Sequence, residues 1–230
     1  MKKGNKLKLV GIAMLFFGVI MLFNIQTANA TATLRLQDVN GYLDIVDGGI
    51  YDSNTTAGVV TYSGGFDSIW TVNVTTGITY PVLGSLSYPE LDLNSVNVSS
   101  SAGGTLDIYF SETGFGTTGN AQFTTQIGGV TGGTVTGYTY LDNGNNLFGT
   151  TTLLGTLGPN TNSFSGTTTT SLDPSDPYSL TNKATITHSG SDVTSFNLTT
   201  VVVPEPVSYT LFVVGGALLG FMRFRKTKKS

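Results

Sequence analysis

The chain has 230 residues, no cysteine and a formal net charge of −3. Without cysteine no disulfide can form, so the stability of the fold must come from packing or from bound ions. Nine of the 11 cations lie before residue 9 or after residue 222, which leaves two cations and 13 acids in residues 31–203, a formal charge of −11. A domain this acidic repels the phosphates of nucleic acid and of anionic lipid, and the sequence argues against both as partners.

The first 30 residues predict an export signal. A basic start precedes an apolar run over residues 9–23, and the segment ends in Ala28-Asn29-Ala30. The cations of the basic start are Lys2, Lys3, Lys6 and Lys8. The small side chains of Ala28 and Ala30 fit a signal peptidase site, which would make Thr31 the first residue of the mature protein. A retained N-terminal anchor is the alternative, but the apolar run is short for a membrane span.

Residues 31–203 predict an all-β domain. The region is rich in Gly, Thr, Ser and Asn, and short runs alternate between apolar and polar side chains. In one such run Leu106, Ile108 and Phe110 share a face, while Asp107 lies on the other. This alternation is typical of antiparallel sheets that have one face in water. We therefore expect one antiparallel β-sandwich of the jelly-roll type over residues 31–202.

About ten short strands are expected in this domain. Alternation places them at residues 34–36, 58–62, 69–75, 91–98, 105–110, 122–127, 134–141, 147–154, 183–188 and 196–202. Turns are expected at residues 47–49, 63–65, 101–104 and 143–146, which are rich in Gly, Asn and Ser. A β-solenoid over residues 128–170 is the second fold considered, but no fixed period supports it. Local disorder of residues 160–170 is the preferred alternative to a solenoid there.

The last 28 residues, from Val203 onward, have three parts. Val203-Pro204-Glu205-Pro206 comes first, and its two prolines predict an extended, unpaired segment that a processing enzyme can grip. The apolar run over residues 207–222 is about 24 Å long as a helix, which makes a short membrane span. The basic end that follows predicts a cytoplasmic side. Its cations are Arg223, Arg225, Lys226, Lys228 and Lys229.

In these parts and their order, residues 203–230 resemble the PEP-CTERM sorting signal of bacteria that possess an exosortase. The resemblance implies export in a Gram-negative bacterium, with signal peptidase and exosortase as processing partners. It also implies that the protein is held briefly in the inner membrane and then reaches the cell surface or the extracellular matrix. Residues 184–188 and 193–196 resemble, more loosely, the β-rich domain that often precedes this signal. The alternative is an ordinary C-terminal anchor that follows a proline-rich linker.

Few residues in the chain suggest catalysis. His188 is the single histidine, no G-x-S-x-G motif accompanies it, and its position before a Ser-Gly pair predicts a strand end that faces solvent. Glu90, Glu112 and Asp107 could supply the carboxylate pair of a glycosidase, although acids scattered among turns more often keep a surface soluble. We therefore predict a non-enzymatic protein that needs no cofactor.

A group of acids near the start of the mature region could supply oxygen ligands to calcium. These residues are Asp38, Asn40, Asp44, Asp47 and Asp52. Their spacing does not match an EF-hand loop, which needs glycine at its sixth position and glutamate at its twelfth. The preferred interpretation is that they are turn residues between strands.

Two hypotheses for function follow from the sequence. The first is a non-catalytic surface or matrix protein, exported and then sorted through residues 203–206. The second is a carbohydrate-binding module of an exopolysaccharide or biofilm matrix, because Trp70 and ten tyrosines offer rings on which sugars can stack. Tyr138 and Tyr140 share one face of an expected strand and could form such a platform, although tyrosine pairs on sheets more often pack across strands.

Overall fold

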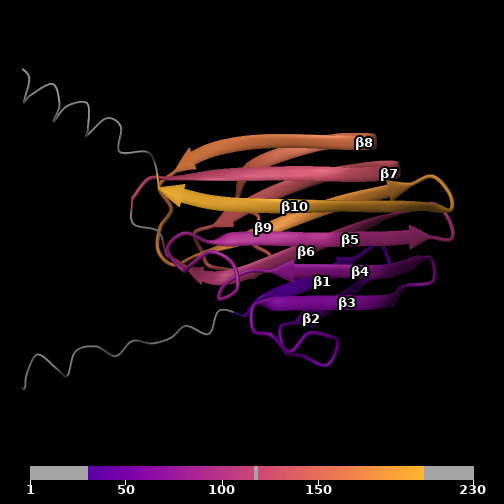
Figure 1. Ribbon diagram of the computed structural model, residues 1–230, viewed down its shortest axis with the longest axis horizontal. Coiled ribbons are helices and arrows are strands. Elements are labelled where there is room, and N and C mark those ends of the chain that lie inside the picture. The colour runs from indigo at the N-terminus through magenta and orange to yellow at the C-terminus, as the bar shows by residue number, and fades with distance from the viewer. Residues whose placement is uncertain (1–30, 117–118, 205–230) are drawn as a thin grey trace, which may run out of the picture.

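A computed structural model describes residues 31–116 and 119–204 of the chain. These residues form ten strands and no helix, and every strand pairing is antiparallel. The strands are β1 (Thr33–Gln37), β2 (Tyr42–Val46), β3 (Val59–Phe66), β4 (Trp70–Ile78), β5 (Glu90–Ser100), β6 (Gly104–Phe115), β7 (Ala121–Asp142), β8 (Thr152–Leu172), β9 (Tyr178–His188) and β10 (Asp192–Pro204) (Figure 1). The expected all-β class is therefore confirmed.

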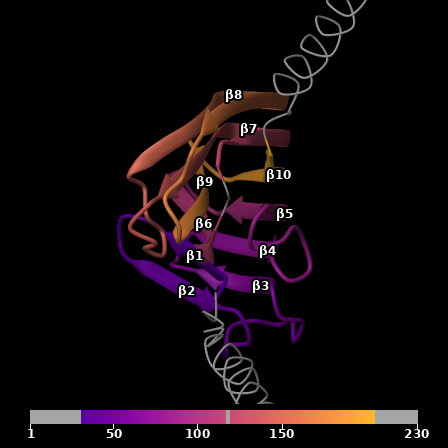
Figure 2. The same cartoon turned by 90° about the vertical axis from the view of Figure 1, so that its left-hand side faces the viewer.

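The ten strands form one continuous sheet that folds into two layers. Its order is β2-β1-β6-β9-β7-β10-β5-β4-β3, and β8 pairs with β7 alone. Residues 134–142 of β7 pair with β9, whereas residues 121–131 pair with β10. β7 and β8 thus run from one layer into the other and join them along one side (Figure 2). The first layer is β2-β1-β6-β9 with residues 134–142 of β7, and the second layer is β3-β4-β5-β10 with residues 121–131.

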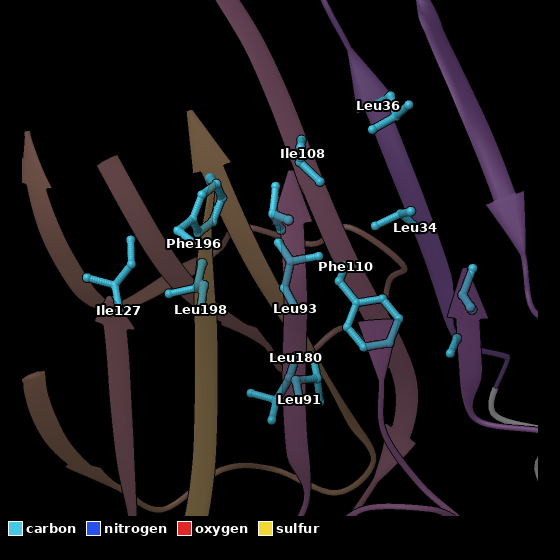
Figure 3. Packing of buried hydrophobic residues seen from close by; sticks show 14 of the residues in the cluster. Leu34, Leu36, Leu91, Leu93, Ile108, Phe110, Ile127, Leu180, Phe196 and Leu198 are labelled. Atoms are coloured by element: carbon cyan, nitrogen blue, oxygen red, sulfur yellow. The ribbon is translucent and has the colours of Figure 1, made fainter. Parts of the chain in front are cut away.

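The core lies between the two layers, as the alternation predicts. Leu34, Leu36, Ile108 and Phe110 of the first layer are fully buried, as are Leu91, Leu93 and Leu198 of the second (Figure 3). Close approach of the layers explains the glycine at position 77 of β4. A Cβ there would lie 2.3 Å from ring carbons of Phe110, so the ring occupies the space that a side chain would need. Burying Phe110 stabilises the fold by roughly 2–3 kcal/mol before any cavity contribution.

A buried amide links the layers by hydrogen bonds. The side chain of Asn182 on β9 donates to the carbonyl oxygens of Leu91 (3.0 Å) and Leu198 (3.2 Å). Its Oδ1 accepts from the hydroxyls of Thr139 (3.0 Å) and Thr200 (2.7 Å). Asn182 is completely buried, and all of its hydrogen-bonding capacity is used. This satisfied polar group fixes how β9 lies against β5 and β10.

Several strand and turn expectations are wrong in detail. β2 was not expected, and the strands expected at 122–127 and 134–141 are two halves of β7. Residues 160–170 belong to β8 and are not disordered, while residues 147–151 precede that strand. Residues 63–65 lie within β3, where a register shift replaces the expected turn. A similar shift in β4 beyond Val72 turns Thr75 inward, and it is buried rather than solvent-facing.

The beginning of the predicted sorting motif is also paired, contrary to expectation. Val203 and Pro204 end β10, opposite Gln122 and Ala121 of β7. Glu205, Pro206 and the residues after them lie outside the described part of the chain, as do residues 1–30 with Ala28 and Ala30. Within residues 31–116 and 119–204, no helix has the length and apolar character needed to cross a membrane.

Candidate functional site

One row of side chains crosses the outer face of the first layer. Asp44 of β2, Arg35 of β1, Tyr109 of β6, Lys183 of β9 and Tyr138 of β7 stand directly opposite one another in successive pairings. The residues on either side of them along each strand point inward, so all five point away from the core. We call these five residues the aromatic row. At about 4.8 Å between strands, the row spans roughly 19 Å.

Arg35 forms the first ion pair of the row. Its Nε and Nη2 donate to Oδ1 and Oδ2 of Asp44 at 2.6 and 2.7 Å, a bidentate pairing. The guanidinium carbon lies 4.4 Å from the ring centre of Tyr42 and 4.1 Å from that of Phe148. The hydrogen bond to Asp44 raises the pKa of Arg35 above its ordinary value. Two rings and a carboxylate therefore fix this side chain in one orientation.

Lys183 forms the second ion pair. Its Nζ lies 2.9 Å from Oδ2 of Asp107, and Oδ1 of the same carboxylate accepts from Thr185 at 2.6 Å. The ammonium group also lies 5.0 Å from the ring centre of Tyr109 and 5.9 Å from that of Tyr138. Burial lowers the pKa of Lys183, but hydrogen bonds to Asp107 and Tyr109 outweigh burial and leave the pKa raised.

The rings on this face are arranged for stacking. Tyr138 and Tyr140 lie 6.0 Å apart with an interplanar angle of 18°, which confirms that they share a face. Tyr109 and Phe148 meet edge to face at 6.0 Å, and Tyr42 is 63% exposed. Burial raises the pKa of Tyr140, so its hydroxyl is neutral at physiological pH. Half-exposed rings next to charged donors and acceptors form a surface that can contact both faces and edges of a flat, hydroxyl-rich ligand.

The loop between β7 and β8 holds Phe148 over Arg35. Asp142 at the end of β7 accepts hydrogen bonds from Gly144, Asn146 and Thr151, and the bond from the Asn146 side chain is the main cause that lowers its pKa. The backbone N–H of Phe148 donates to the hydroxyl of Ser111 at 3.0 Å, and Phe148 has a positive φ of 58°. Such a backbone conformation is uncommon for a bulky residue, and these bonds maintain it.

His188 does not face solvent, contrary to the prediction from its position. It is buried, and its ring centre lies 5.2 Å from that of Trp70. Ser100 Oγ lies 2.7 Å from Nδ1 and donates to the carbonyl of Gly190, while Nε2 lies 2.8 Å from the hydroxyl of Thr194. Burial lowers the pKa of His188. The ring contacts hydroxyls on both sides and no carboxylate, so the arrangement is a hydrogen-bonded part of the core.

The three candidate carboxylates lie on three different surfaces. Asp107 lies on the outer face of the first layer, Glu90 on that of the second, and Glu112 points into the space between them. Burial raises the pKa of Glu112 to about 7, and its Oε2 accepts from the hydroxyl of Thr79 at 2.5 Å. The structure therefore does not bring these acids together as a glycosidase pair.

The acids considered for calcium accept hydrogen bonds from turns, as the preferred interpretation has it. Asp38 accepts from the N–H groups of Asn40 and Gly41, and Asp47 from that of Gly58. Asp44 is the exception, because it pairs with Arg35. Among residues 31–116 and 119–204, no group of three or more acidic or histidine side chains is placed to hold a metal ion.

Sequence reasoning found only part of the site. It found Tyr138 and Tyr140, but it missed Arg35, Lys183 and the rings around them, and it wrongly included Trp70, which is 2% exposed. The distribution of charge along the sequence could have pointed to Arg35 and Lys183. Arg35 and Lys183 are the only two cations of residues 31–203, and both occupy outward positions between buried neighbours.

No family model and no curated protein matches the chain. Among solved structures, it is similar to TmCBM61 bound to beta-1,4-galactotriose, with a TM-score of 0.32, 10% identity and coverage of 62% of this chain and 92% of that one. It is also similar to the K1 cleaved adhesin domain of Lys-gingipain from Porphyromonas gingivalis (TM-score 0.34, 14% identity, 76% and 99% coverage). It is similar as well to the C-terminal CBM6 of LamC from Zobellia galactanivorans, with a TM-score of 0.24, 13% identity and coverage of 61% of this chain and 98% of that one. Likenesses at these scores establish neither a shared fold nor a shared ligand.

Proposed function

We propose that residues 31–204 form a non-catalytic domain that binds polysaccharide through the outer face of the first layer. The observation that carries this proposal is the aromatic row, with Tyr42, Tyr140 and Phe148 beside it. Exposed rings stack against the C–H faces of sugars, and the fixed ion pairs offer donors and acceptors to sugar hydroxyls. A row of roughly 19 Å accommodates several consecutive sugar units.

The charge of this face indicates a neutral ligand. Arg35 is paired with Asp44 and Lys183 with Asp107, so the two cations and two carboxylates balance. An acidic polysaccharide would approach a domain whose formal charge is −11 without meeting a free cation on this face. A neutral polysaccharide avoids that repulsion.

Retention on polysaccharide tests the proposal. The full chain in mild detergent is run through native gels that contain a neutral galactan, a neutral β-glucan or an acidic uronate polymer. We expect retardation by a neutral polymer, and a roughly tenfold or greater loss of affinity in the double variant Tyr138→Ala with Tyr140→Ala. The matched control is Thr124→Ala with Thr169→Ala, which removes an adjacent hydroxyl pair from the outer face of the second layer. Equal retention of the two double variants would contradict the proposal.

We further propose that the chain is exported, cleaved after Ala30 and sorted through Val203-Pro204-Glu205-Pro206 by an exosortase. The support is the resemblance of residues 203–230, together with a signal-like N-terminus and an acidic domain between them. Changing Pro204, Glu205 and Pro206 to alanine should leave an unprocessed form in the inner membrane. Mass spectrometry of both ends of the exported protein measures this. Exported wild-type protein that still carries Ser230 would disprove the sorting proposal.

A further inference from the structure

β8 is a long edge strand that lacks the usual protection against pairing with another chain. It runs for 21 residues, pairs with β7 on one side only and contains no charged residue. Exposed edges are normally interrupted by charges, prolines or bulges, or are kept short. Pro159 interrupts the middle of β8, but residues 162–172 pair with residues 121–131 of β7 without any register shift. This segment is therefore a regular, open edge.

The other two edges of the sheet are protected. β2 has five residues and carries Asp44 at its centre. The free side of β3 is covered by the preceding loop. The N–H of Ser53 donates to the carbonyl oxygen of Thr61 at 2.9 Å, and the N–H of Thr61 donates to the carboxylate of Asp52 at 2.9 Å. Residues 162–172 have no such cover: among the described residues, no backbone hydrogen bond outside the strand ladders involves them.

The core is also incompletely covered along this edge. Phe164 and Leu172 point inward from β8 and pack on the core, yet both are only half-buried. On the neighbouring strand the inward-facing Phe123, Thr125 and Ile127 are buried. A strand added beside β8 would remove apolar surface of Phe164 and Leu172 from water and pair the free backbone groups.

We propose that two copies of this chain associate by antiparallel pairing of residues 162–172 of their β8 strands. Two copies of this acidic domain, each with a formal charge of −11 over residues 31–203, repel each other least where they meet along β8, because this strand carries no charged residue. Self-complementarity fixes the register. With Thr168 on the two-fold axis, Phe164 of one copy stands opposite Leu172 of the other, and Thr167 stands opposite Thr169.

The oligomeric state of the full chain in mild detergent tests the association. Sedimentation over a range of concentrations should show a monomer–dimer equilibrium. Thr167→Lys places a lysine on each copy opposite Thr169 of the other, so that two like charges lie diagonally across the pairing, and it should raise the dissociation constant about tenfold or more. The matched control Thr71→Lys, an exposed threonine of β4, should leave the constant within about twofold. A protein that stays monomeric at all concentrations, or equal effects of the two lysines, would overturn the proposal.

Crosslinking tests the register, because the chain has no cysteine of its own. Thr167→Cys mixed with Thr169→Cys should form a disulfide-linked dimer under mild oxidation. Either variant alone holds its two Cα atoms about 8 Å apart, beyond the reach of a disulfide. No link in the mixture, or a link that forms as readily in either variant alone, would reject this register. Hydrogen exchange adds a further check. Protection, in dilute monomer, of those β8 amides that point away from β7 would show that another segment covers the strand and would refute the dimer.

Discussion

The outer faces of the two layers obey the same alternation but carry different side chains. On the first layer the aromatic row places Asp44, Arg35, Tyr109, Lys183 and Tyr138 side by side. On the second layer an equivalent row runs through Thr169, Thr124, Val201 and Glu90. Small β-branched residues are sufficient for a sheet face in water.

The difference separates what a solvated sheet face needs from what it does not need. The Thr-rich outer face of the second layer has what a solvated sheet needs. The large rings and fixed ion pairs on the outer face of the first layer are not needed for a solvated sheet. Surface ion pairs contribute little to stability, and exposed rings leave apolar area in water. The first layer therefore carries the candidate site, and the second layer serves as its internal control. Four predictions test this comparison, beginning with the core that supports both faces.

Removing the ring of Phe110 should damage both faces together. Phe110→Ala is expected to lower the free energy of unfolding by about 3–5 kcal/mol, because the ring fills the space between the layers beside Gly77. Urea unfolding followed by the fluorescence of Trp70, the single tryptophan, measures this loss. Gly77→Ala alone should cost about 1–3 kcal/mol through overpacking. In the double variant the two losses of unfolding free energy should not add, because the space left by the ring of Phe110 accommodates the new methyl group. Additive losses would contradict the contact between position 77 and Phe110.

Glu112 should make the stability of the whole domain fall as the pH rises. Its pKa is about 7 in the folded protein against an ordinary value of 4.5. Between these values the folded protein keeps a proton that the unfolded chain releases, so stability decreases from pH 4.5 to 7. Glu112→Gln should lack this decrease and be about 3 kcal/mol more stable than wild type at pH 8, with little difference at pH 4.

The control for this pH effect is Glu90→Gln on the outer face of the second layer, which should follow wild type. His188 acts in the opposite direction. Burial lowers its pKa, so stability is lost as the pH falls below the ordinary value of 6.5. That contribution is common to wild type and both glutamine variants and cancels in their differences. Parallel curves for wild type and Glu112→Gln between pH 4 and 8 would contradict the prediction.

Removing Arg35 should affect the first layer alone. Arg35→Ala deletes the bidentate pair with Asp44 and the contacts to Tyr42 and Phe148, and should lower the free energy of unfolding by about 1–2 kcal/mol. Retention on neutral polysaccharide should fall as well. Arg35→Lys keeps the charge but lacks the planar fork, and should restore only part of either property. Full recovery with lysine would show that charge alone matters at this position.

The smallest effect is expected on the second layer. Thr124→Ala with Thr169→Ala should change the free energy of unfolding by no more than about 0.5 kcal/mol and leave retention on polysaccharide unchanged. Thermal unfolding and the gel assay measure both quantities. A clear loss of retention would indicate that the second layer takes part in binding and would contradict the assignment of the site to the first layer.

Alternation in the sequence was sufficient to predict most of the strands and the inward side chains of β6, and to place Tyr138 and Tyr140 on one face. It could not predict the aromatic row, because Arg35, Tyr109 and Lys183 become neighbours only through pairings between strands more than 70 positions apart. It also failed where a register shift interrupts alternation, as at Thr75. His188 was misplaced because a strand end can be covered by distant residues, here Trp70 and Ser100.

The position of β10 has a mechanical consequence. The strand lies between β5 and β7, is bonded to both over most of its length, and ends at Pro204. A pull applied at that end along the strand loads both ladders in shear, so many hydrogen bonds resist together rather than opening one at a time. By contrast, β8 has one ladder only, and tension across it would unzip the bonds in sequence. The described domain thus ends in a strand that is held by ladders on both sides.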